Sequence, residues 1–170
     1  MKTSTWAIGC LTLMSLTGFT LTTGATDDAE AGFEAEVSGD VSASPSGEAR
    51  FGITGGLGDV PEIFTISLGA NAEEGSVLFT RRSGEPVIPG TYFISDRTDG
   101  SADVQALVMT GSATRPTGVF QGRSGTLVIT EVSDTTVRGR FRIEATGFLA
   151  AEPEREGRPV SVSGSFTATR

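Results

Sequence analysis

Apolar and polar residues alternate along the last part of the chain. In residues 137–145 every second position is apolar or glycine, and Arg138, Arg140 and Arg142 stand between them. Residues 160–168 repeat the alternation, with serine or threonine at every intervening position. Successive side chains of a β-strand point to opposite faces, so this pattern predicts half-buried antiparallel strands.

These two predicted strands share a sequence pattern. Both carry the pattern Val-x-Gly-x-Phe, which starts at Val137 in the first and at Val162 in the second. The two glycines, Gly139 and Gly164, fall on the apolar face, where glycine often marks a bend or a bulge. The pattern therefore favours a sheet that curls.

The rest of the chain continues as short strands separated by glycine-rich turns. Ala49, Phe51 and Ile53 are expected to point inward from one strand, and residues 148–157 form a polar connection before the last one. No stretch carries a helical apolar stripe, so the fold class is all-β, an antiparallel β-sandwich or partly closed β-barrel of about nine strands. The expected strands are 33–37, 48–53, 63–68, 76–80, 91–95, 102–109, 125–131, 137–145 and 160–168, with 118–121 as a shorter candidate.

The first 25 residues predict a cleaved signal peptide. Lys2 precedes an uncharged, apolar and hydroxyl-rich run, and small residues follow up to Ala25. These are the parts of a secretory signal, and they predict export to the periplasm, the cell surface or the medium of a bacterial cell. The predicted organisation is a signal peptide at 1–25, a flexible acidic leader at 26–32 and a single all-β domain at 33–170.

A lipid anchor at Cys10 is the alternative for localisation. Ala7-Ile8-Gly9-Cys10 is similar to the site at which bacterial lipoproteins are acylated, although an apolar stretch follows it where a polar tether is usual. Acylation would hold the protein at a membrane. The mature chain itself is expected to contain no transmembrane segment.

Composition excludes several classes of chemistry. Residues 26–170 contain no Cys, His, Trp or Lys, and they hold 12 Arg against 21 Asp and Glu, a net charge of −9. Without these residues there is no Ser-His-Asp or Cys-His arrangement, no Schiff base and no ordinary zinc site. The acidic balance argues against nucleic acid as a partner. We therefore expect no cofactor, no metal and no enzymatic activity.

Carboxylates are the remaining candidates for catalysis. A carboxylate-dependent hydrolase needs two acids that converge across a cleft, one of them with a raised pKa. Glu34, Glu36, Glu48 and Glu62 lie on or beside predicted strands, but alternation places the first three on the solvent face. A hydrolase is therefore kept as an alternative to a solvated acidic surface.

The acidic stretch 96–103 lies between two predicted strands. Asp96, Asp99 and Asp103 offer oxygen ligands of the kind that calcium prefers, but their spacing does not follow the EF-hand loop. A hairpin turn built on Asp99 and Gly100 explains the same residues and is the preferred interpretation.

The arginines of 137–145 are the candidate binding residues. Arg138, Arg140 and Arg142 are expected to stand about 7 Å apart on one face of a strand. On an acidic protein such a stripe could hold a carboxylate or a phosphate group. The alternative is pairing with Glu131, Glu144 or the acids of a neighbouring strand, which would only stabilise the sheet.

Residues 124–131, 137–143 and 160–166, together with the step Pro89-Gly-Thr-Tyr92, carry a resemblance to other proteins. In these residues the chain resembles a class of bacterial secreted proteins and lipoproteins of unknown function, over roughly residues 85–170. The resemblance implies a compact all-β module exported to the periplasm or the cell surface. It transfers no functional residue.

The sequence thus predicts a non-enzymatic secreted or cell-envelope β-domain, a binding or structural module. Its partner would be a protein, a glycan or a small apolar ligand. A carrier of lipocalin-like shape is an alternative that needs unfilled space inside the fold. That space would be lined by Phe51, Phe64, Phe79, Phe93, Phe141 and Phe166.

Overall fold

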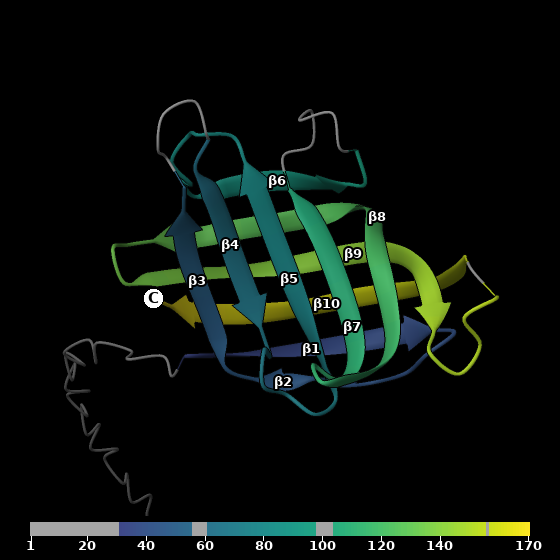
Figure 1. The fold of residues 1–170 in the computed structure, drawn as a ribbon. Helices are drawn as coiled ribbons and strands as arrows, with labels where there is room; N and C mark the ends of the chain where they lie inside the picture. The colour runs from purple at the N-terminus through teal and green to yellow at the C-terminus, as the bar shows by residue number, and fades with distance from the viewer. Residues whose placement is uncertain (1–30, 56–60, 98–103, 156) are drawn as a thin grey trace, which may run out of the picture.

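The computed structural model describes residues 31–55, 61–97, 104–155 and 157–170. Within these ranges the chain forms β-strands and no α-helix, which confirms the predicted all-β antiparallel class (Figure 1). The described part accordingly contains no helix that could cross a membrane. The predicted signal peptide lies outside the described residues, as does most of the predicted leader, whose last residue, Gly32, already belongs to the first strand.

The described residues form ten strands, where the pattern predicts about nine. The expected segments 118–121 and 125–131 merge into one 18-residue strand, and a two-residue strand is added near the start. The strands are β1 (Gly32–Gly39), β2 (Ser46–Gly47), β3 (Ala49–Thr54), β4 (Ile63–Leu68), β5 (Gly75–Arg82), β6 (Gly90–Ser95), β7 (Gln105–Ser112), β8 (Arg115–Val132), β9 (Thr136–Leu149) and β10 (Arg158–Thr169).

All ten strands belong to one sheet that folds over into two layers. Neighbouring strands pair in the order β1, β10, β9, β8, β7, β5, β4, β3, with β2 beside β1 and β6 beside the second half of β8. In Figure 1 strands β3, β4, β5 and β7 cross steeply over β1, β10, β9 and β6. The pairings between these strands are antiparallel, apart from the parallel bridge from Thr169 of β10 to Arg50 of β3.

The packing of β9 against β10 explains why both strands carry the pattern Val-x-Gly-x-Phe. In the antiparallel register Gly139 stands opposite Phe166, and Gly164 stands opposite Phe141. A Cβ atom at either glycine would lie 2.9 Å from the ring opposite, closer than side chains tolerate. The repeated Val-x-Gly-x-Phe pattern therefore lets each strand cover the glycine of its neighbour with an aromatic ring.

Two residues expected in the interior are exposed instead. Phe93 is 65% exposed because the register of β6 on β8 turns its neighbours Tyr92 and Ile94 into the core. Ile53 is 47% exposed because it lies near the end of β3, opposite the half-buried Phe64. Phe120, which the sequence placed only in a short candidate strand, is fully buried.

The connections also differ from the expectation at two places. Strand β9 continues to Leu149, so the polar connection starts two residues later than the sequence indicated. In the described residues β6 pairs with β8, and its bridge to the segment before β7, from Ile94 to Val104, is parallel, whereas the predicted hairpin requires antiparallel pairing. The turn at Asp99 and Gly100 lies outside the described residues.

Candidate functional site

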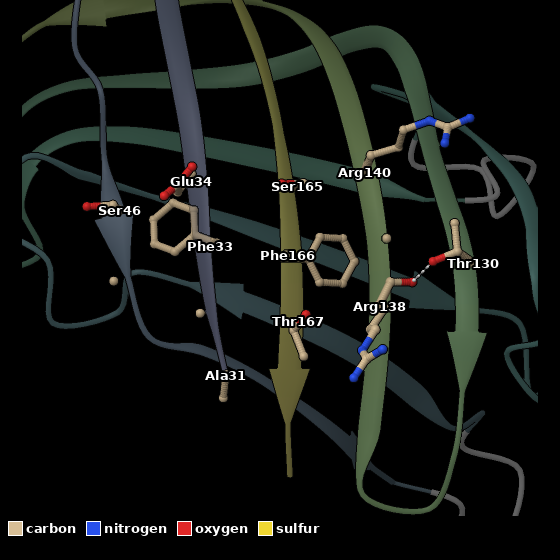
Figure 2. Close-up of a pocket in the computed structure, with 13 residues that line it drawn as sticks. Ala31, Phe33, Glu34, Ser46, Thr130, Arg138, Arg140, Ser165, Phe166 and Thr167 are labelled. Carbon is tan, nitrogen blue, oxygen red and sulfur yellow. Dashed lines mark hydrogen bonds between the residues drawn. The ribbon is translucent and has the colours of Figure 1, made fainter. Parts of the chain in front are cut away.

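A hollow opens on the layer of β1, β10 and β9. It has a volume of about 650 Å³ and is open to solvent. Figure 2 shows its lining side chains, which come from β1, β2, β8, β9 and β10. The lining combines two arginines, one acid and four hydroxyl groups: Arg138, Arg140, Glu34, Ser46, Thr130, Ser165 and Thr167.

The strand register explains why these polar groups converge. Glu34 of β1, Ser165 of β10 and Arg140 of β9 form one row across three adjacent strands. Thr167 and Arg138 form a second row, two residues along each strand. Side chains two apart on a strand share a face, so both rows project to the same side. Between them lies a row of buried residues, Phe33, Phe166 and Gly139.

The hydroxyl group of Thr130 reaches the hollow from a β-bulge in β8. The register of β8 on β9 passes from Ile129 to Glu131, which leaves Thr130 as the extra residue. A bulge redirects the side chain of the extra residue, and here Thr130 donates a 3.2 Å hydrogen bond to the carbonyl of Arg138, drawn as a dashed line in Figure 2. The bulge thereby brings a threonine hydroxyl to the arginine side of the hollow.

Among the arginines that line hollows, Arg140 stands apart. Arg138 pairs with Glu131 at 3.2 Å, Arg81 pairs with Glu85, and Arg123 pairs with Asp96. Arg140 is exposed and makes no ion pair with any residue that the structure describes. Its guanidinium group is thus available to a ligand that carries negative charge.

The structure places the three arginines predicted as binding residues in different surroundings. Arg138 and Arg140 line the hollow together, whereas Arg142 does not. Arg142 is 75% exposed and its Nε lies 3.5 Å from the carboxylate of Glu144. The two interpretations of the arginine stripe therefore hold for different members: Arg138 and Arg142 have the expected acidic neighbours, and Arg140 has none in the described residues.

The acids considered for hydrolysis lie on the surface. Glu34, Glu36, Glu48 and Glu62 are all exposed, and only Glu34 lines the large hollow. Within the described ranges no group of three His, Cys, Asp or Glu side chains gathers into a metal-binding arrangement. Chemically, the hollow offers positive charge and hydroxyl groups for binding.

The core phenylalanines pack against one another. The rings of Phe79 and Phe141 lie 5.2 Å apart, and those of Phe141 and Phe166 lie 6.5 Å apart. Two spaces that reach Phe64 have volumes of about 20 and 10 Å³, which is room for about one water molecule each. These spaces are far smaller than the cavity that a lipocalin-like carrier requires.

A second, smaller hollow of about 260 Å³ lies beside Arg123, the extra residue of the other bulge in β8. Arg123 donates a hydrogen bond to the carboxylate of Asp96 and another, 2.7 Å long, to Thr146. The bond from Arg123 lowers the pKa of Asp96 below its ordinary value of 3.8. Because Arg123 already has these two partners, the smaller hollow is a weaker candidate for an anion-binding site.

The Asp96 contact gives a pH prediction. Because the pKa of Asp96 is lowered in the folded state, the ion pair stabilises the fold above the ordinary pKa, and the contribution is lost as the pH falls through the lowered value. Arg123→Ala should return the pKa of Asp96 toward 3.8, as followed by NMR titration of the carboxyl carbon. Arg97→Ala, which removes a weaker influence, should shift it less. Equal shifts in the two variants would contradict the assigned cause.

The chain matches no protein-family model, no curated protein and no solved structure. The chemistry of the hollow therefore carries the functional proposal.

The other lining residues were not identified as site residues from the sequence. Alternation does place Glu34, Ser165 and Thr167 on the polar face of their strands. What alternation does not provide is the order of the strands, in which β1 from the start of the domain lies beside β10 from its end. Thr130 depends in addition on a bulge, which interrupts the period of two.

Proposed function

We propose that the protein is a non-enzymatic, exported β-domain of the bacterial envelope that binds a hydroxyl-rich anionic ligand, of the acidic saccharide class. The binding site is the hollow on β1, β10 and β9. The observation that carries the proposal is Arg140, an arginine without an ion pair among the described residues, set in a hollow with four hydroxyl groups. Guanidinium groups bind carboxylate and phosphate oxygens through charge-assisted hydrogen bonds.

The size and lining of the hollow suit a sugar-sized ligand. Its volume of about 650 Å³ lies within the range of small-molecule sites. Serine and threonine hydroxyl groups both donate and accept hydrogen bonds, so Ser46, Ser165 and Thr167 match a ligand rich in hydroxyl groups. The openness of the site to solvent favours weak, readily reversible binding.

Two further parts of the proposal rest on the sequence and the topology. Export is supported by the signal-like residues 1–25, and attachment through Cys10 is the alternative. A partly closed barrel is supported by the continuous pairing from β10 round to β3, which the single bridge between Thr169 and Arg50 completes. The exposed positions of Glu34, Glu36, Glu48 and Glu62 favour binding over hydrolysis.

The test compares two arginines of the same strand. Arg140→Ala should weaken binding of glucose 6-phosphate about tenfold, a loss of about 1.4 kcal/mol, because it removes the unpaired guanidinium group. Arg142→Ala removes the same charge from β9 outside the hollow and should change affinity by less than about twofold. Isothermal titration calorimetry at low ionic strength measures both.

If Arg140→Ala and Arg142→Ala lose affinity equally, binding depends on the net charge of the protein and not on the hollow. That result would overturn the proposed site. Absence of binding by the unsubstituted protein would do the same. Glucuronate, titrated in parallel, tests whether a carboxylate replaces the phosphate.

A further inference from the structure

Glu34 lies in the same hollow as Arg140, on the opposite side of β10. We infer that the ligand of this hollow is dipolar, with a protonated amino group that binds Glu34 and an anionic group that binds Arg140. This inference rests on the proposed function and adds to it the chemical class of the ligand: an amino sugar that carries a phosphate or a carboxylate.

The register fixes how far apart Glu34 and Arg140 stand on the sheet. Glu34 pairs with Ser165, and Ser165 pairs with Arg140, so one strand separates the acid from the arginine. Directly opposite residues have Cβ atoms about 5 Å apart, which places the two Cβ atoms about 10 Å from each other. In Figure 2 the carboxylate of Glu34 and the guanidinium of Arg140 extend from their strands on either side of Ser165.

Neither charged group is neutralised within the described residues. Glu34 is exposed and forms no ion pair there, and the same holds for Arg140. The remaining charged residue that lines the hollow differs, because Arg138 pairs with Glu131. The hollow thus presents a carboxylate at one side and a guanidinium group at the other, with the hydroxyl of Ser165 between them.

The charge of the whole protein supports a dipolar ligand. Residues 26–170 carry a net charge of −9, so a purely anionic ligand is repelled by the surroundings of the site. Glu34 adds to this repulsion from within the hollow. A ligand that also carries an ammonium group converts the same carboxylate from a repulsive neighbour into an attractive one.

Three related sugars separate the contribution of the amino group to binding from that of the anionic group. Glucosamine 6-phosphate carries both charges, glucose 6-phosphate carries only the anion, and glucosamine carries only the amino group. At about pH 6, where an amino group is protonated, and at low ionic strength, glucosamine 6-phosphate should bind about fivefold more tightly than glucose 6-phosphate. Glucosamine alone should bind most weakly.

Variants of β1 identify the acid. Glu34→Gln should abolish the preference for glucosamine 6-phosphate while the affinity for glucose 6-phosphate stays the same or rises. Glu36→Gln changes an exposed acid of the same strand that does not line the hollow and should leave the preference intact. Both changes are on the surface, so thermal unfolding should show folded variants.

The outcomes distinguish this inference from the proposed function. Equal binding of the two sugar phosphates would overturn the dipolar ligand while the anion site stands. A preference that survives in Glu34→Gln would overturn the role of Glu34. If neither sugar phosphate binds, the proposed function and this inference both fail.

Discussion

Replacement of Phe120 by alanine is expected to lower the free energy of unfolding by about 3–5 kcal/mol. Phe120 is fully buried on β8, and truncation of its ring would leave a cavity that the neighbouring strands cannot close. The loss is a large part of the total stability of an ordinary domain. Urea unfolding followed by circular dichroism measures it.

Phe93→Ala is the matched control, because it makes the same chemical change at a ring that is 65% exposed. It should cost less than about 1 kcal/mol. If Phe120→Ala does not fold, Phe120→Leu keeps most of the volume and should lose less than the alanine variant. Similar losses at positions 93 and 120 would contradict the register of β6 and β8.

The second large effect is expected at Gly139. A Cβ atom there would lie 2.5 Å from the carbonyl oxygen of Val128 and 2.9 Å from the ring of Phe166. Because a backbone atom cannot move aside as a flexible side chain can, Gly139→Ala should destabilise the fold by about 2–3 kcal/mol. Urea unfolding again provides the measurement.

Gly52→Ala is the control for this substitution. Gly52 also lies within a strand, but a Cβ atom there would be 3.7 Å from the hydroxyl of Thr65, an ordinary contact. Alanine should be neutral or stabilise by up to about 1 kcal/mol, because glycine weakens strand interiors. A Gly139→Ala variant as stable as Gly52→Ala would show that β8 and β10 do not approach Gly139 as described.

The alternation of apolar residues predicts most of this fold. It is most reliable in β9 and β10, where Phe141 and Phe166 are buried as expected. It fails at Phe93, because Tyr92, Phe93 and Ile94 are consecutive apolar residues and therefore interrupt the alternation. It also fails to join the two halves of β8, since a bulge at Arg123 interrupts the alternation between them.

The candidate site could be predicted only in part. Arg138 and Arg140 were identified because a charged stripe is visible within one strand. Glu34 lies more than 100 residues earlier, and only the pairing of β1 with β10 brings it near them. Long-range strand pairing of this kind depends on the whole sheet, so a local pattern does not contain it.

The location of anion binding is the central claim, and ¹H–¹⁵N NMR of the protein titrated with glucose 6-phosphate tests it most directly. The claim predicts that the amide signals which shift belong to the strands around the hollow, with the largest changes near Arg140, Ser165 and Thr130. Shifts centred on other exposed arginines, such as Arg50 or Arg115, with the hollow unchanged, would contradict it.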